Sequence, residues 1–145
     1  MLIEERSAAD GELAVLLDAA FAELVARYGP EGRSRVKEGA RFLVASVDGQ
    51  AVGCGAVQHV DDLTGELKRM YVLPEYRGRG IATSILTALE GLAWDLGYRR
   101  LRLATGLRQP EAIALYERCA YRPIEPYGKY VDAPLTRCYE KPLAR

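Results

Sequence analysis

The chain has 145 residues, and its 20 Lys and Arg side chains balance 20 Asp and Glu side chains to a formal net charge of zero. Hydrophobic residues make up 49% and charged residues 28%, which excludes a disordered chain and is typical of one globular domain of about 100–200 residues. The neutral balance argues against general nucleic-acid binding, which is largely neutralisation of phosphates. A local basic site remains compatible with it.

Several other classes of protein are disfavoured. The sequence lacks the basic segment and apolar stretch of a secretory signal, and no run of about 18 apolar residues predicts a membrane span. Cys54, Cys119 and Cys138 do not have the spacing of metal ligands, and His59 has no Cys or His neighbour. We therefore expect a cytoplasmic protein in which residues 1–145 form a single domain, with no metal, membrane or nucleic-acid partner.

The first predicted element is a helix over 8–28, because apolar residues recur there at helical spacing and Ser7 is a candidate N-cap. Gly29-Pro30 ends this helix. The polar stretch 31–39 is compatible with a short helical turn.

Strand-like segments follow. Residues 41–47 and 51–58 flank Asp48-Gly49, a strong signal for a β-hairpin. A second turn over 60–65 leads to a third strand at 66–73. Together these segments predict an antiparallel meander.

The second half of the chain alternates helices and strands. Apolar residues line one face of a helix over 81–96, a strand follows at 99–105, and a helix over 110–119 begins with a proline. The tail ends in a strand at 136–142. This order predicts an α/β domain built around one mixed sheet.

The most informative stretch is 66–83, ELKRMYVLPEYRGRGIAT, where a strand enters a loop that opens directly onto the strongest helix. Free N–H groups at a helix N-terminus favour an anion, and Gly78 and Gly80 allow the backbone to approach it closely. Arg77 and Arg79 add positive charge suited to phosphate oxygens. The P-loop and the dinucleotide fingerprint are both excluded, because neither spacing of glycines occurs here.

The remaining pattern, Arg77-x-x-Gly80-x-Ala82, resembles the [RQ]-x-x-G-x-[GA] pyrophosphate loop of the GNAT superfamily of N-acetyltransferases. A second segment, Ala112-x-x-Leu115-Tyr116-Glu117-Arg118-Cys119-Ala120-Tyr121, is similar to the family's A-x-x-[LF]-Y-x-x-x-G-[FY]. Ala120 replaces the usual glycine. A positive φ is less favourable for alanine than for glycine, so the local turn is expected to differ from the family's.

The resemblance spans nearly the whole chain and implies a fold. It implies a single GNAT-like domain with a mixed, mostly antiparallel sheet of about six or seven strands flanked by helices. It also implies a V-shaped split between the strands near 66–73 and 99–105. The first of these strands usually carries a bulge in the family. Strict alternation would put Leu67 opposite Met70 and Val72, and one extra residue would bring all three to the same face.

The resemblance further implies acetyl-CoA as the cofactor, bound in this split. Matching by motif predicts cofactor contacts from the end of the strand, the loop and the next strand: Met70, Tyr71, Val72, Arg77, Gly78, Arg79, Gly80, Ile81, Ala82, Thr83 and Thr105.

Two residues are candidates for catalysis. Tyr116 occupies the position where the family often has a general acid, and a phenol can donate a proton to a leaving thiolate. The alternative is a tyrosine packed in the core. Glu66 is a candidate general base acting on the amine, and its alternative is a solvated acid beside Asp61 and Asp62. These three acids could also attract a cationic amine.

The acceptor wall is predicted from Tyr28, Tyr127 and Tyr130, which line an amine pocket or, alternatively, form packing or the surface of a homodimer. Lys68 and Arg69 are interpreted as a solvated or ion-paired strand face. The implied function is acetyl-CoA-dependent transfer of an acetyl group to a primary amine of a small molecule, by direct attack on the thioester. The alternatives are an enzyme acting on protein or peptide amino groups, and a non-catalytic regulatory module that binds acyl-CoA.

Overall fold

The computed structural model describes residues 1–29 and 36–144, so most of the predicted turn within 31–39 lies outside the described residues. In chain order the elements are β1 (Leu2–Arg6), α1 (Gly11–Tyr28), β2 (Arg41–Val47), β3 (Gln50–Asp61), β4 (Thr64–Val72), η1 (Pro74–Tyr76), α2 (Ile81–Asp95), β5 (Arg100–Gly106), α3 (Pro110–Arg118), β6 (Arg122–Ile124), η2 (Gly128–Tyr130) and β7 (Thr136–Pro142); η1 and η2 are short 3-10 helices.

The described strands form one seven-stranded sheet in the order β1-β2-β3-β4-β5-β7-β6. Among these strands β4 and β5 run parallel, and every other neighbouring pair is antiparallel. The prediction of a mixed, mostly antiparallel sheet is therefore confirmed.

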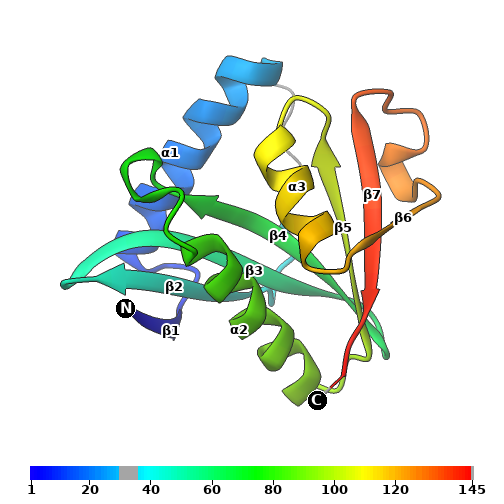
Figure 1. The fold of residues 1–145 in the computed structure, drawn as a ribbon. Helices are drawn as coiled ribbons and strands as arrows, with labels where there is room; N and C mark the ends of the chain where they lie inside the picture. The colour runs from blue at the N-terminus through cyan, green and yellow to red at the C-terminus, as the bar shows by residue number, and fades with distance from the viewer. Residues whose placement is uncertain (30–35, 145) are drawn as a thin grey trace.

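Helices cover both faces of the sheet (Figure 1). Apolar residues of α2 and α3 pack in one core cluster with one face of the sheet, and Leu13 and Leu16 of α1 pack in a second cluster on the other face. Strand β2 contributes to both clusters, because Leu43 belongs to the first and Val44 to the second. A strand buried on both faces reads as a continuous apolar run, as residues 41–47 do.

The hairpin between β2 and β3 has the turn that its sequence predicts. Val47 pairs with Gln50, and both residues between them have positive φ, 51° at Asp48 and 81° at Gly49. Two consecutive positive φ values define the type I′ turn, which matches the twist of a hairpin.

Two features at the start of the chain differ from the prediction: β1 precedes the first helix, and α1 begins later than expected. Residues 2–6 form an edge strand paired with β2, and all five of them are exposed or only partly buried, so the strand shows no apolar alternation. The N-cap of α1 is Asp10, whose carboxylate accepts a 3.0 Å hydrogen bond from the Leu13 N–H, and the helix begins at Gly11 instead of residue 8. Ser7 instead accepts a bond from the Ala9 N–H in the preceding turn.

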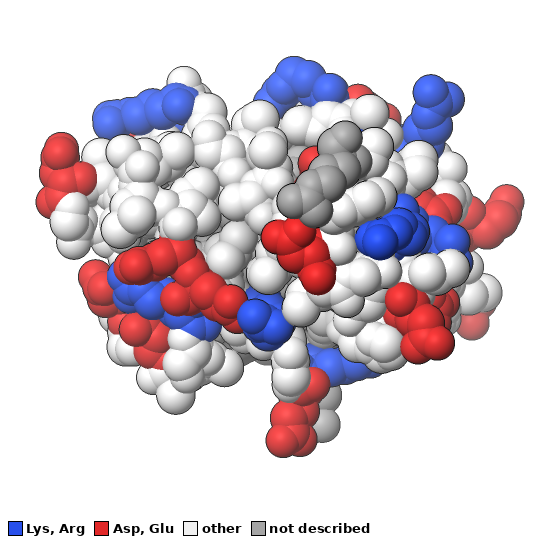
Figure 2. All heavy atoms as spheres, turned by 90° about the horizontal axis from the view of Figure 1, so that it is seen from below, with Lys and Arg blue, Asp and Glu red and all other residues white. Residues whose placement is uncertain are grey.

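The surface carries both signs of charge. On the face drawn in Figure 2, Lys and Arg side chains lie among Asp and Glu side chains. Local pairs account for part of this mixture, since Arg6 bridges to Glu4, Asp10 and Glu12. Among the described residues, no helix combines the length and apolar character needed to cross a membrane.

Candidate active site

The candidate site is the split between β4 and β5. In the described part of the chain, their pairing ends at Glu66 and Arg102, after three residue pairs that begin at Thr64 and Arg100. Beyond that point the two strands point apart, as Figure 1 shows. The predicted V-shaped split is therefore confirmed. The divergence leaves one edge of β4 facing the opening.

A bulge lies in β4 at the mouth of the split. Cys54 of β3 pairs with Tyr71 and Ala56 pairs with Lys68, so two residues lie between the β4 partners where β3 has one. Arg69 within the bulge has a φ of 58°, and its carbonyl accepts a 3.3 Å bond from the Cys54 thiol. Such bulges bend a strand and increase its twist, which here accompanies the divergence from β5.

The bulge also changes which side chains share a face. Leu67, Met70 and Val72 all contact the cluster that contains α2 and α3. Strict alternation would place Leu67 on the other face, so the single extra residue predicted from the sequence is confirmed. Lys68 consequently lies on the opposite face, toward α1 and η2.

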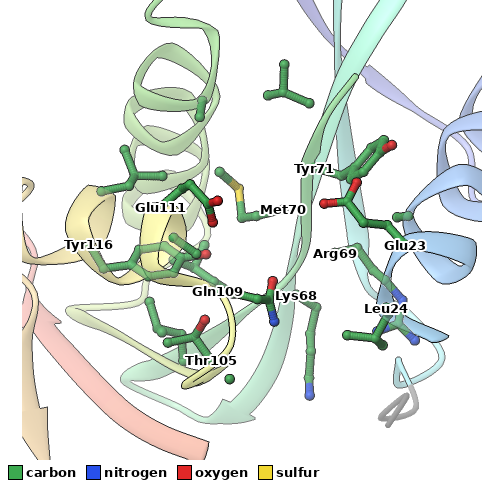
Figure 3. A pocket seen from close by; sticks show the side chains of 18 of the residues that line it. Glu23, Leu24, Lys68, Arg69, Met70, Tyr71, Thr105, Gln109, Glu111 and Tyr116 are labelled. Atoms are coloured by element: carbon green, nitrogen blue, oxygen red, sulfur yellow. The ribbon is translucent and has the colours of Figure 1, made fainter. Parts of the chain in front are cut away.

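A cavity of about 710 Å³ fills the split. Figure 3 shows Thr105, Gln109 and Tyr116 on its α3 side and Arg69 and Tyr71 on its α1 side. Most of the predicted site residues line it: Tyr28, Met70, Tyr71, Val72, Arg77, Gly78, Gly80, Ile81, Ala82, Thr83, Thr105, Tyr116 and Tyr130. Glu66, Arg79 and Tyr127 lie outside this lining.

One end of the cavity is the start of α2. Gly80 is the N-cap with a φ of 80°, and Gly78 has a φ of 77°. A Cβ at either glycine would point into open space but would require an unfavourable backbone conformation. The first helical bond runs from the Ser84 N–H to the Gly80 carbonyl, so the N–H groups of residues 81–83 precede the helical ladder. We call Gly78, Gly80 and the N–H groups of residues 81–83 the α2 cradle. It suits an anion such as a pyrophosphate.

The two arginines of the loop are held by the protein itself. Arg77 donates to the Val72 carbonyl at 2.9 Å and to the Glu23 carboxylate at 2.7 Å, and the ion pair with Glu23 raises its pKa. Arg79 lies over the Tyr76 ring and donates to a carbonyl of η1 at 3.2 Å. In this arrangement the side chain of Arg77 ties the loop to β4 and α1, and the backbone amides of α2 remain as the anion donors.

The backbone of β4 faces the split at alternate residues. The Leu73 N–H donates to the Val52 carbonyl of β3 at 2.8 Å. Because successive peptide groups of a strand point to opposite neighbours, the groups of Val72 point toward β5, as do those of Met70 two residues earlier. These are the positions where the family resemblance predicts main-chain contacts.

Tyr116 on α3 is almost fully buried, at 6% exposure, and lines the cavity. Its ring packs edge-to-face on Tyr121 with centroids 5.7 Å apart. Burial raises the pKa of Tyr116 above its ordinary value near 10. The phenol therefore keeps its proton throughout the neutral range, as a donor must.

Glu66 lies at the apex of the split, where it is 4% exposed. Its carboxylate contacts the Lys68 ammonium and the Arg102 guanidinium, each at 3.2 Å. It is thus neither solvated nor part of the cavity lining, and Lys68 belongs to an ion pair as expected. Asp61 and Asp62 are exposed and lie outside the lining.

Arg102 was not among the predicted site residues, because its pairing with Glu66 depends on the register of two strands that are distant in sequence. The one available signal was the alternation in RRLRLAT, which places Arg100 and Arg102 together on the face opposite the leucines. The contacts of Tyr28 could not be predicted from the sequence either. Its hydroxyl accepts a 2.7 Å bond from the Arg108 N–H.

Comparisons with known proteins agree with this geometry. The model of the acetyltransferase (GNAT) family matches residues 12–121. An IAA acetyltransferase of Azospirillum brasilense is 41% identical over 104 residues, which span 71% of this chain and 68% of that protein. The matched segments span 54% and 57% of two further curated relatives.

Solved structures share the fold along the whole chain. One, provisionally assigned as an acyl-CoA N-acyltransferase from Klebsiella pneumoniae, has 33% identity and a TM-score of 0.86, covering 99% of this chain and 97% of its own. A GNAT family acetyltransferase from Elizabethkingia anophelis, solved with acetyl-CoA bound, has 16% identity and a TM-score of 0.73, covering 98% and 97%. The chain therefore belongs to the GNAT family of acetyltransferases.

Proposed function

We propose that residues 1–145 form a single acetyl-CoA-dependent N-acetyltransferase domain that acetylates a primary amine of a small molecule. The observation that carries this proposal is the continuous cavity that joins the α2 cradle, the unpaired edge of β4 and the Tyr116 hydroxyl group. Acetyl-CoA, when bound, supplies an acetyl group activated as a thioester.

The residues present fit this cofactor. The amides of residues 81–83, made accessible by Gly78 and Gly80, would bind the pyrophosphate. The peptide groups of Met70 and the N–H of Val72, whose carbonyl already accepts a bond from Arg77, would bond the pantetheine arm along the open edge of β4. Thr105, 7% exposed at the end of β5, borders the same space from the opposite strand.

Tyr116 is the proposed general acid. Its hydroxyl group is protonated and lies in the cavity on the α3 side, where it can donate a hydrogen bond to the leaving thiolate. The raised pKa favours hydrogen-bond donation over complete proton transfer, because the phenol becomes a weaker acid as its pKa rises.

The cavity favours a small acceptor. The tail closes against β4, since the Lys68 ammonium donates to the Tyr130 hydroxyl of η2 at 3.1 Å. Tyr28 at the end of α1 and Tyr130 both line the cavity. A closed wall of this kind suits a small molecule better than an extended peptide. Glu66 is separated from the cavity by its own ion pairs, so its geometry supports holding Lys68 and Arg102 in place more than it supports a role as base.

Two measurements test the proposal together. Calorimetric titration with acetyl-CoA should show binding, and thiol release from acetyl-CoA should accelerate with members of an amine panel. Binding without turnover on any amine would favour a non-catalytic acyl-CoA-binding module. Turnover confined to peptide amino groups would favour a protein acetyltransferase, and an absence of binding would overturn the assignment of the loop.

A further inference from the structure

The wall of the cavity opposite α2 and α3 carries basic side chains where β4 borders it. Lys68 and Arg69 of β4 line it there, and Tyr130 lines the cavity as well. Arg102 stands directly behind Lys68, because both bind the same carboxylate of Glu66. The buried Glu66 carboxylate thus pairs with Lys68, which lines the cavity, and with Arg102, which lies outside the lining. We call the group of Glu66, Lys68, Arg102 and Tyr130 the basic cluster.

The basic cluster is largely removed from solvent. The side chains of Glu66 and Lys68 are 5% and 9% exposed, and that of Arg102 is 27% exposed. Charges in such surroundings are screened less than surface charges, so their field extends into the adjoining cavity. Among the described charges of the cluster, two cations stand against one anion.

Tyrosine hydroxyl groups stand beside these charges. Tyr130 accepts the bond from Lys68 through its oxygen and still carries an O–H group that can donate. The neighbouring Tyr127 packs edge-to-face on Tyr130 at 5.4 Å and carries the Arg102 guanidinium over its ring at 3.7 Å. The Tyr127 hydroxyl oxygen is buried without a hydrogen-bond partner among the described residues. The cluster therefore combines positive charge with the hydroxyl donor of Tyr130, and both are groups that bind a carboxylate.

The acids that line the cavity are engaged elsewhere. Glu23 of α1 pairs with Arg27 at 3.0 Å and with Arg77 at 2.7 Å, and Glu111 of α3 lies 4.0 Å from Arg27. Glu23 lies on the same α1 side of the cavity as Arg69 (Figure 3), but its carboxylate is paired with Arg27 and Arg77. This arrangement is the reverse of the acidic attraction suggested by Asp61, Asp62 and Glu66 in the sequence.

Building on the proposed function, we infer that the acceptor is an amine that also carries an anionic group, with a carboxylate as the simplest case, and that Lys68 and the Tyr130 hydroxyl bind this group. The bond would fix the acceptor by its anionic end and leave the amine directed toward the cavity. Polyamines and other polycationic acceptors would be repelled by the same wall.

The test compares matched acceptors on the wild-type protein. The probes are an α-amino acid, its carboxamide, which lacks the negative charge, and a simple diamine. Rates are expressed per concentration of neutral amine, because the three amines differ in pKa. The expected result is a kcat/KM at least about tenfold higher for the carboxylate than for the carboxamide, as a charge-assisted hydrogen bond predicts.

Two variants test whether the preference for the carboxylate acceptor depends on the basic cluster. Lys68→Met should raise KM for the carboxylate about tenfold and change KM for the carboxamide little, because only the former uses the charge. Arg100→Gln is the matched control, since it removes one positive charge from the same face of β5 where Arg100 pairs with Glu140 at the exposed surface. If Lys68→Met does not fold, the wild-type comparison alone decides.

The outcomes separate this inference from the proposed function. Equal or faster turnover of the carboxamide or the diamine would overturn the inference and leave the N-acetyltransferase proposal intact. A carboxylate preference that persists unchanged in folded Lys68→Met would also overturn it. An absence of turnover with every probe and every other amine would overturn the proposed function and this inference with it.

Discussion

The hydroxyl group of Tyr28 lies directly over Gly106, so close that a Cβ at position 106 would overlap it. The same hydroxyl accepts the Arg108 N–H, and the Arg108 guanidinium donates to the Arg27 carbonyl at 2.7 Å. The last turn of α1 is thereby fastened to the loop between β5 and α3, across the mouth of the split.

This contact predicts a steep cost for Gly106→Ala. The added methyl group must displace the Tyr28 ring, so the free energy of unfolding should fall by about 1–3 kcal/mol. Gly91→Ala in α2 is the matched control, because its Cβ would meet open space and a helical glycine is replaced, which should stabilise by about 0.5–1 kcal/mol. Denaturant unfolding of both variants checks the pair. Equal effects would contradict the close contact.

The α2 cradle predicts a selective loss of cofactor binding in Gly80→Ala. An alanine with a positive φ is strained by about 1–2 kcal/mol. The backbone at position 80 should shift to relieve this strain, which should move the N–H groups of residues 81–83. Affinity for CoA, measured by calorimetry, should fall about tenfold or more. Gly97→Ala is the control, since Gly97 also has a positive φ, 98°, at the other end of α2. It should lose similar stability and keep its affinity, and a comparable loss of affinity in both would rule out the cradle as the cause.

Tyr116→Phe should separate turnover from binding. Removal of a general acid lowers kcat by about 10²-fold or more, whereas affinity for acetyl-CoA should stay within about threefold. Tyr121→Phe is the neighbouring control, because the Tyr121 hydroxyl donates to Glu90 at 2.8 Å within the core. That variant should lose about 1 kcal/mol of stability and retain its kcat. Unchanged turnover in Tyr116→Phe would remove this residue as the acid.

Replacement of Ala120 by glycine is expected to stabilise the fold. Its φ is 72°, so the chain keeps the left-handed turn for which the family commonly uses glycine, despite the side chain. Ala120→Gly should therefore raise the free energy of unfolding by about 1 kcal/mol. Ala88→Gly, in the interior of α2, should lower it by a similar amount. A loss of stability in both variants would show that position 120 is unstrained.

The buried Tyr116 and Tyr121 and the partly buried Tyr127 predict how stability changes at alkaline pH. Burial raises the pKa of Tyr116, Tyr121 and Tyr127, while the unfolded chain releases these protons near pH 10. The unfolded state therefore loses protons first, and the stability that is fully present below pH 10 declines as pH rises further. Titration followed by tyrosinate absorbance should show part of the phenols ionising only as the protein unfolds. Ionisation of all nine tyrosines near pH 10 in the native state would contradict the burial.

Local chemistry explains which parts of the fold could be predicted. The Asp48-Gly49 turn and the Gly78 and Gly80 loop were predictable because a positive φ favours a small set of residue types. The strands at 41–47 and 136–142 have the bounds that the sequence predicts. Strand β1 was not predictable, because as an exposed edge strand it owes its structure to pairing with β2.

In the candidate site too, features that depend on a local motif could be predicted, and features that depend on strand register could not. The loop and Tyr116 belong to contiguous motifs, so they were identified from the sequence, although the structure places Arg77 against Val72 and Glu23. The shared ion pair of Glu66 depends on the parallel register that places Arg102 beside it. No local pattern reports such a register, so Glu66 was interpreted as a base or a solvated acid.

The central claim is amine-dependent acetyl transfer from acetyl-CoA. Its most direct measurement is the rate of thiol release from acetyl-CoA by the wild-type protein, with and without an amine, together with mass-spectrometric detection of the acetylated amine. We predict a rate that saturates with amine concentration and an acetylated product formed in equal amount to the free thiol. Thiol release that is the same with and without every amine tested would contradict the claim.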